Sequence, residues 1–94
     1  MDFTRIGRIK SSLVEVNFDC GTYDKDIIAL LIYFDLSDRS NVSLERLQNS
    51  LVAYKETFDY YTFITTIREL HNREYLSVDW DKETIALINV QDLE

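Results

Sequence analysis

A change of hydrophobic period in the segment that begins at Phe58 is the feature that most constrains the fold. The first half of this segment has apolar residues at the spacing of one helical face, namely Phe63, Ile64, Ile67 and Leu70. The second half alternates as a half-buried strand does, with Leu76, Val78 and Trp80 at every second position. The sequence Asn72-Arg73-Glu74 separates the two patterns. A helix that turns into an edge strand is therefore predicted, which favours an α+β fold.

Another two helices are predicted before this segment. Residues 27–36 are apolar on nearly every side, which fits a central helix or a buried strand. The flanking aspartates and the run Ala29-Leu30-Leu31 favour the helix, with Thr22 or Asp24 as its expected N-cap. Ser43 is the expected cap of the next helix. That helix has one apolar stripe, made of Leu44, Leu47, Leu51 and Tyr54.

The sequence pattern defines the end of the second helix and the hairpin less sharply than the preceding elements. A turn at residues 55–57 is expected to separate the second helix from a third over residues 58–72, capped by Thr57 or Asp59. A single helix from Leu44 to His71 is the alternative. Two strands, over residues 75–80 and 84–90, then form a C-terminal hairpin.

The first 19 residues fit two patterns. One is a helical face, formed by Phe3, Ile6, Ile9, Leu13 and Val16. The other is the alternation typical of a strand, from Leu13 to Phe18. We favour a short helix or irregular arm followed by that strand. The expected organisation is an N-terminal arm over residues 1–23 and one compact domain over residues 24–94.

Size and composition fit one domain that stays in the cytoplasm. The chain has 94 residues, of which 46% are hydrophobic, enough for one modest core. Its longest apolar run, residues 27–34, is too short to span a bilayer, and its first residues lack the apolar stretch of a signal peptide. Cys20 is the single cysteine, so an internal disulfide is excluded.

Catalytic, cofactor-binding and metal-binding patterns are missing from the sequence. Phosphate-binding loops, dinucleotide fingerprints and zinc-ligand spacings do not occur. A Cys20–His71 dyad would need the two side chains to meet, and no pattern indicates this. The pairs Asp24-x-Asp26 and Asp79-x-Asp81 offer too few ligands for calcium or magnesium. We therefore expect a protein that is not an enzyme and has no cofactor or metal.

The order of the predicted elements resembles the winged-helix (winged helix-turn-helix) family over about residues 24–90. Residues 42–47 resemble the start of that family's second helix, and residues 63–78 resemble its third helix and first wing strand. The resemblance implies three helices followed by a hairpin, with the third helix in the major groove of DNA and the wing on phosphates. Many members have a glycine where this chain has Glu74. Asn72 is then expected to supply the left-handed residue that ends the helix.

The charge of this chain disfavours the nucleic-acid role that the resemblance implies. The formal net charge is −7, and a binder of the phosphate backbone depends on Lys and Arg. The outer face of the predicted third helix has one basic residue, Arg73, with Arg68 at its margin, and the hairpin tip has three acids and one lysine. As an alternative, a dimer could bring together a DNA-binding set, made of Arg5, Arg8, Lys10, Thr65, Arg68 and Arg73. A solvated face is the explanation that we favour for the basic residues near the N-terminus.

Surplus aromatic residues point instead to contact with protein. Tyr60 and Tyr61 are adjacent on a helix and cannot both face the core, and Trp80 lies near a turn. They are the candidate interface, with Asp79, Asp81 and Glu83 as an acidic rim; packing beneath residues 1–19 is the alternative. We expect a non-catalytic interaction module that binds itself or a larger assembly, away from membranes. Small acidic chains without proline also occur among phage and mobile-element proteins.

Overall fold

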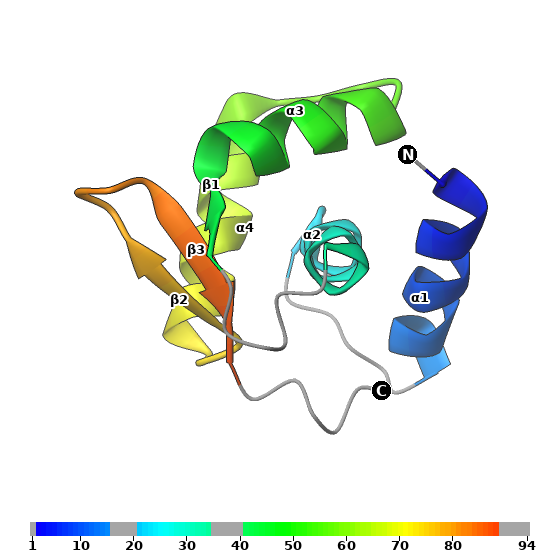
Figure 1. Cartoon of the computed structure of the whole chain (residues 1–94), viewed down its shortest axis with the longest axis horizontal. Helices are drawn as coiled ribbons and strands as arrows, with labels where there is room; N and C mark the ends of the chain where they lie inside the picture. The colour runs from blue at the N-terminus through cyan, green and yellow to red at the C-terminus, as the bar shows by residue number, and fades with distance from the viewer. Residues whose placement is uncertain (1, 16–20, 35–40, 89–94) are drawn as a thin grey trace.

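The computed structural model describes residues 2–15, 21–34 and 41–88, which form a small α+β domain (Figure 1). Its helices are α1 (Phe3–Glu15), α2 (Asp24–Tyr33), α3 (Leu44–Tyr54) and α4 (Tyr60–Asn72). Its strands are β1 (Val42–Ser43), β2 (Leu76–Asp79) and β3 (Thr84–Leu87). The α+β class is confirmed, but the described residues contain four helices rather than three, and the hairpin is part of a three-stranded sheet.

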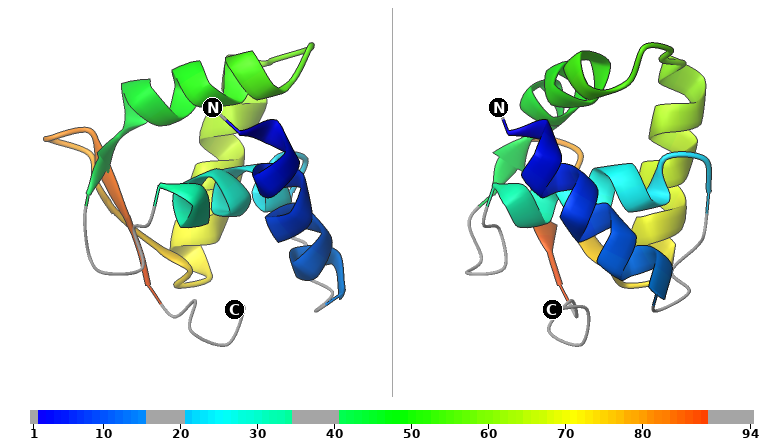
Figure 2. Two further views of the ribbon diagram at one scale, coloured as in Figure 1. Left: turned by 45° about the vertical axis from the view of Figure 1, so that its right-hand side comes forward. Right: turned by 90° about the vertical axis from the view of Figure 1, so that its right-hand side faces the viewer.

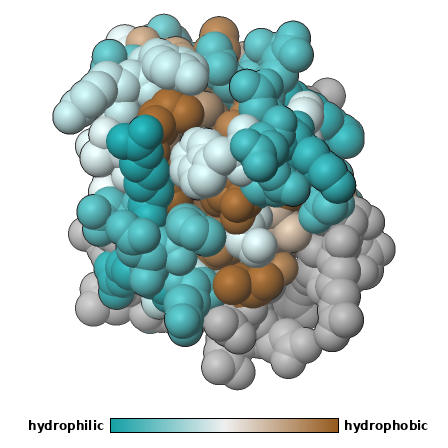
Figure 3. Space-filling view, turned by 90° about the vertical axis from the view of Figure 1, so that its left-hand side faces the viewer, coloured by the Kyte–Doolittle hydropathy of each residue, from teal (hydrophilic) through white to brown (hydrophobic). Residues whose placement is uncertain are grey.

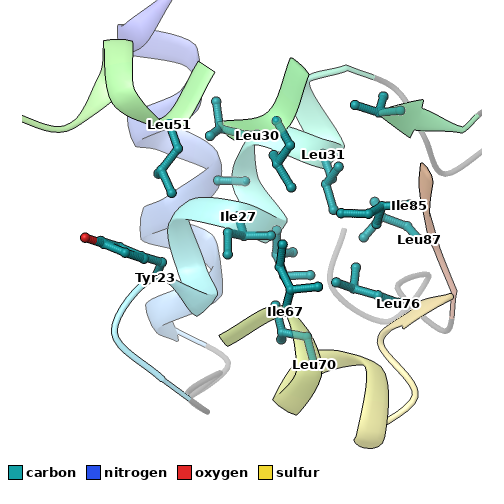
Figure 4. Packing of buried hydrophobic residues seen from close by; sticks show 14 of the residues in the cluster. Tyr23, Ile27, Leu30, Leu31, Leu51, Ile67, Leu70, Leu76, Ile85 and Leu87 are labelled. Carbon is teal, nitrogen blue, oxygen red and sulfur yellow. The ribbon is translucent and has the colours of Figure 1, made fainter. Parts of the chain in front are cut away.

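Helix α2 is the centre of the molecule, because its side chains are apolar on nearly every side. Every residue from Ile27 to Leu31 has no exposed surface. Figures 1 and 2 show α1 on one side of α2 and the hairpin on the other, with α3 and α4 enclosing the remaining sides. Side chains of α2, α3, α4 and the hairpin converge in one hydrophobic cluster (Figure 4).

The N-terminal segment is helical where a strand was expected. Leu13 and Glu15 belong to α1, so the predicted strand is wrong up to Glu15, and its remainder, residues 16–18, lies outside the described residues. The helical pattern prevails because Ile6 and Leu13 lie two turns apart on one face, and both are fully buried in the common core. Helix α1 packs mainly on α2.

Two of the predicted helix caps are confirmed and one is wrong. Ser43 Oγ accepts a hydrogen bond from Arg46 N at the start of α3, and Asp59 accepts one from Thr62 N at the start of α4. At α2 the N-cap is Tyr23, without a side-chain hydrogen bond. The Tyr23 hydroxyl instead accepts a hydrogen bond from Asp59 N at 3.0 Å, which ties the start of α2 to the start of α4.

The sheet has the order β1-β3-β2 and is antiparallel throughout. Leu76 on β2 opposes Leu87 on β3, and both face the core together with Ile85. Strand β2 lies at the edge of the sheet. His71 Nδ1 lies 3.2 Å from Leu76 O, so the imidazole covers a backbone carbonyl of this edge strand.

The turn between α4 and β2 contains a left-handed residue, but at Glu74 rather than at the predicted Asn72. Asn72 is the last helical residue, whereas Glu74 has φ 65°. Tyr75 N donates to Leu70 O and Glu74 N donates to His71 O, which is the Schellman pattern that ends a helix. A glutamate therefore occupies the position at which many winged helices have glycine.

The described order from α2 to β3 is compatible with a winged-helix topology. It runs helix, short strand, helix, helix and hairpin, and the short strand β1 pairs with β3 of the hairpin. Leu44 N also donates to Glu83 O at 2.8 Å, so the start of α3 is fastened to the hairpin. Helix α1 is an addition before this order.

We expect Glu74→Gly to stabilise the protein by about 1 kcal/mol, because glycine adopts a positive φ without the steric cost of a Cβ atom. The exposed Glu74 side chain makes contacts that are worth less than this gain. Urea unfolding measures the change. The matched control, Glu69→Gly within α4, should destabilise by about 1 kcal/mol. Destabilisation by both variants would contradict the role assigned to the backbone of Glu74.

Candidate functional site

The outer face of α4 is formed by one row of side chains. Tyr61, Thr65, Arg68 and Asn72 recur at three- and four-residue spacing and are all exposed. The opposite face is buried, because Phe63, Thr66, Ile67 and Leu70 enter the core. Tyr61 is 78% exposed, the highest value among the large hydrophobic side chains described. No described element covers this row, so α4 presents it to solvent.

The start of α4 is held firmly by its cap. The Asp59 carboxylate accepts hydrogen bonds from the hydroxyl and the backbone N–H of Thr62. These bonds stabilise the charged carboxylate and hold the pKa of Asp59 below its usual value. The cap is therefore fully formed at neutral pH, and it positions Tyr60 and Tyr61 in the first turn of the helix.

Trp80 lies beside the α4 row, at the tip of the hairpin. Asp79 Oδ1 accepts hydrogen bonds from the backbone N–H groups of Asp81 and Lys82, both at 3.1 Å, which shapes the tip. Trp80 is 43% exposed, and the guanidinium of Arg68 lies 5.9 Å from the centre of its ring. Arg68 thus joins the helix row to the hairpin tip.

The side chains of Tyr60 and Tyr61 point in different directions, because adjacent residues on a helix face different sides. The Tyr60 ring lies 6.3 Å from that of Phe63 and stays 58% exposed, so it covers the edge of the core. Tyr61 points away from the core. Residues 2–15 do not cover these aromatics, since Tyr60, Tyr61 and Trp80 are all exposed and α1 packs mainly on α2. The rest of the N-terminal segment for which such packing was the alternative, residues 1 and 16–19, lies outside the described residues.

The charge around this face is acidic. From Asp59 to Glu83 the sequence has six acidic and three basic residues. Two of the three basic groups lie over aromatic rings, Arg68 on Trp80 and Arg73 on Tyr75. Asp79, Asp81 and Glu83 are all exposed around the tip. Figure 3 views the side on which the hairpin lies, and it shows hydrophobic side chains surrounded by hydrophilic ones.

A small pocket flanks the α4 row on the side away from Trp80. It has a volume of about 160 Å³ and is lined by Gly21 and Thr22 on one side and by α4 residues, from Tyr61 to Glu69, on the other. A Cβ atom at position 21 would lie only 3.1 Å from Thr66 Oγ1, so the glycine keeps the segment close to α4. The pocket is smaller than the 300–1,000 Å³ typical of small-molecule sites, and its size suits one side chain.

A second hollow, of about 450 Å³, lies at the start of α3 and has no evident chemistry. Its lining is Ser43, Glu45, Arg46, Asn49 and Ser50. Ser43 is occupied as the helix cap, and the Arg46 guanidinium stacks 4.4 Å above the Phe34 ring. The remaining groups of the lining do not form a catalytic arrangement.

The basic residues proposed for nucleic acid are divided between two sides of the molecule. Arg5 and Arg8 are exposed on α1, and Arg5 lies 5.6 Å from the Tyr33 ring. Thr65, Arg68 and Arg73 lie on or next to α4, across α2 from α1 (Figure 2). One copy of the chain therefore does not bring these groups together.

Lys10, the remaining member of that set, is bound within the molecule. Its Nζ lies 2.8 Å from Asp26 Oδ1, and Lys55 Nζ lies 3.3 Å from Asp26 Oδ2. The Asp26 side chain is 3% exposed, whereas each lysine keeps about a third of its side chain in solvent. Burial lowers the pKa of Lys10, but the hydrogen bond and charge of Asp26 outweigh it and raise that pKa above its usual value. Asp26 thus connects α1, α2 and the end of α3.

The described part of the chain has no cluster of metal-binding side chains. Three His, Cys, Asp or Glu side chains do not come together there as a metal site. Cys20 lies outside the described residues, so its predicted separation from His71 has no structural test. None of the helices within residues 2–15, 21–34 and 41–88 has the length and apolar character needed to cross a bilayer.

Replacing both lysines that contact Asp26 should lower the free energy of unfolding by more than the sum of the two single replacements. We expect Lys10→Met and Lys55→Met each to cost about 1 kcal/mol or less, because each ammonium is partly solvated. The double variant should cost about 3–5 kcal/mol, because Asp26 is then left buried without a counter-charge. Urea unfolding gives the three values. Lys82→Met on the hairpin is the control and should change little, and additivity would contradict a shared partner.

The same ion pair predicts a loss of stability at alkaline pH. Because the pKa of Lys10 is raised in the folded state, its contribution is complete below the ordinary lysine value of 10.5 and is lost as the pH rises through the folded-state value. The difference in unfolding free energy between the wild type and Lys10→Met should therefore shrink above that pH. A difference that stays constant would show that packing of the lysine stem, rather than its charge, stabilises the fold.

Comparisons with known proteins give no further assignment. A scan against protein-family models, a search of curated proteins and a search of solved structures each found no match. The geometry of the described residues is therefore the basis on which a function is assigned.

Proposed function

We propose that this chain is a non-catalytic, acidic winged-helix module that binds another protein through α4 and the hairpin. The observation that carries the proposal is the exposure of two aromatic side chains, Tyr61 in the α4 row and Trp80 at the hairpin tip. Tyr61 and Trp80 are 78% and 43% exposed on neighbouring elements, and Arg68 lies between them. Aromatic side chains presented in this way are typical anchors of protein interfaces, since each buries a large area at a small entropic cost.

Charge supports a protein partner over a nucleic acid. In a winged helix that reads DNA, α4 and the hairpin would face the phosphate backbone, and binding would release counterions from it. Here the same elements have twice as many acidic as basic residues. Thr65 and Asn72 could reach base edges, but without basic neighbours such contacts lack the positioning that phosphate contacts give.

The fold gives this surface a rigid support. Helix α4 is anchored by four buried residues on its inner face, and its first turn is fixed by the Asp59 cap. The hairpin is fastened to α3 through the bond between Leu44 N and Glu83 O. An interface on rigid elements loses little conformational entropy when it binds, so the surface is suited to stable association as a subunit or accessory of an assembly.

Site-specific photo-crosslinking tests this proposal. A photoreactive phenylalanine analogue at Tyr61 should form adducts with a protein when cells that make the chain are irradiated. The matched control places the same analogue at Val52, which is 47% exposed on α3, and it should give few adducts. A partner captured at both positions would show contact without preference for the α4 row.

A titration with DNA tests the alternative, nucleic-acid role. Random-sequence duplex DNA should leave the anisotropy of the labelled protein unchanged at micromolar concentration and low salt. Binding that weakens steeply as salt is added would instead favour the nucleic-acid role and would overturn the proposal.

A further inference from the structure

We propose that the partner of the α4 and hairpin surface is a basic protein segment, and that the segment places one arginine or lysine side chain in the pocket beside Tyr61. This inference rests on the proposed function and names the chemistry of its partner. It follows from three features of the described residues: the size and lining of the pocket, the exposed aromatic rings of Tyr61 at the pocket and Trp80 at the hairpin tip, and the acidic charge around them.

The pocket has the composition of a site for one cationic side chain. Its volume of about 160 Å³ is enough for one long side chain. Tyr61 forms an aromatic wall, Thr62 and Thr65 add hydroxyl groups, and Glu69 supplies a carboxylate. An aromatic face next to a carboxylate attracts a guanidinium or ammonium through its ring and its charge together. Among the described residues, no lysine or arginine forms an ion pair with Glu69.

The hairpin tip, on the other side of α4, also favours a cationic side chain. Trp80 already holds one guanidinium, that of Arg68, which shows that its ring accepts a cation at this place. Asp79, Asp81 and Glu83 surround the tip and are exposed. A basic segment that crosses α4 from the pocket to the tip would thus meet an aromatic ring and negative charge at each end, Tyr61 with Glu69 at the pocket and Trp80 with the acidic residues at the tip.

A second copy of the chain is the less suitable occupant. Two copies each have a formal net charge of −7, so their approach through acidic surfaces is repulsive. The exposed basic groups of α1 are few, because Lys10 is bound to Asp26 and Arg5 lies over Tyr33. A foreign segment rich in lysine or arginine gives the better charge complementarity.

The test uses Trp80, the single tryptophan of the chain, as a reporter at the surface itself. The full chain is titrated with a short peptide of alternating arginine and serine, and its fluorescence is followed at low salt. A peptide of alternating glutamate and serine is the control ligand. Amide chemical shifts, measured in parallel on the wild-type protein, should change most at Thr65, Glu69 and Trp80.

Two variants with equal charge separate a site from general attraction. The site variant removes three carboxylates of the surface, through Glu69→Gln, Asp81→Asn and Glu83→Gln. The control variant removes three exposed carboxylates elsewhere, through Glu15→Gln, Glu45→Gln and Glu56→Gln. We expect the site variant to weaken binding of the arginine peptide about tenfold, as the loss of three exposed ion pairs implies, and the control variant to weaken it less than about twofold.

Every other outcome overturns the inference. Equal weakening by both variants would show attraction to the net charge alone, and weakening by neither would exclude the carboxylates. Absence of arginine-peptide binding, while the crosslink at Tyr61 persists, would leave the proposed function standing with a partner of other chemistry. A Trp80 signal that depends on protein concentration without peptide would identify a second copy as the occupant. The shifts of the wild-type protein keep the test decisive if a variant does not fold.

Discussion

Burial of α2 on all sides is the constraint from which the rest of this structure follows. A helix with apolar residues around its whole circumference is stable in water only when other elements cover each face. Helix α1 covers one side, α3 and α4 cover others, and the sheet closes the remainder. One of the two buried acidic residues of α2, Asp26, is neutralised by Lys10 of α1 and by Lys55 at the end of α3. The same residue that interrupts the hydrophobic surface therefore helps to set the positions of α1 and α3.

This arrangement explains why α4 and the hairpin are the elements on which we propose an interaction surface. Helix α1 uses its apolar face on α2, and α3 uses its own on the core and on β1. Helix α4 is also buried on its inner side, but its outer row has aromatic and polar groups that no described element covers. The energy that holds α4 in place comes from Phe63, Ile67 and Leu70, so Tyr61 is free to serve binding rather than stability.

Sequence patterns were sufficient for α2, α3, α4, the hairpin and two of the caps, because those features depend on local spacing. The period change after Phe58 predicted both α4 and β2, and Ser43 and Asp59 cap the helices as expected. The prediction of a strand over residues 13–18 is wrong up to Glu15, because burial of Ile6 and Leu13 against α2 stabilises a helix there. The left-handed residue was placed at Asn72 from intrinsic preference, whereas the backbone bond from Tyr75 N to Leu70 O requires it at Glu74. The pocket beside Tyr61 had no sequence signal, since Gly21 and α4 are distant along the chain.

The imidazole of His71 against Leu76 O has a consequence for the behaviour of the protein at high concentration. An uncovered outer strand offers its main-chain groups to any extended segment that arrives, and chains can then join through continuous sheets. Here the imidazole of His71, in the preceding helix, lies within hydrogen-bond distance of one of those groups, the Leu76 carbonyl. The acidic surface adds repulsion between molecules. Both features disfavour the joining of sheets between copies of the chain, and neither covers the exposed ring of Tyr61.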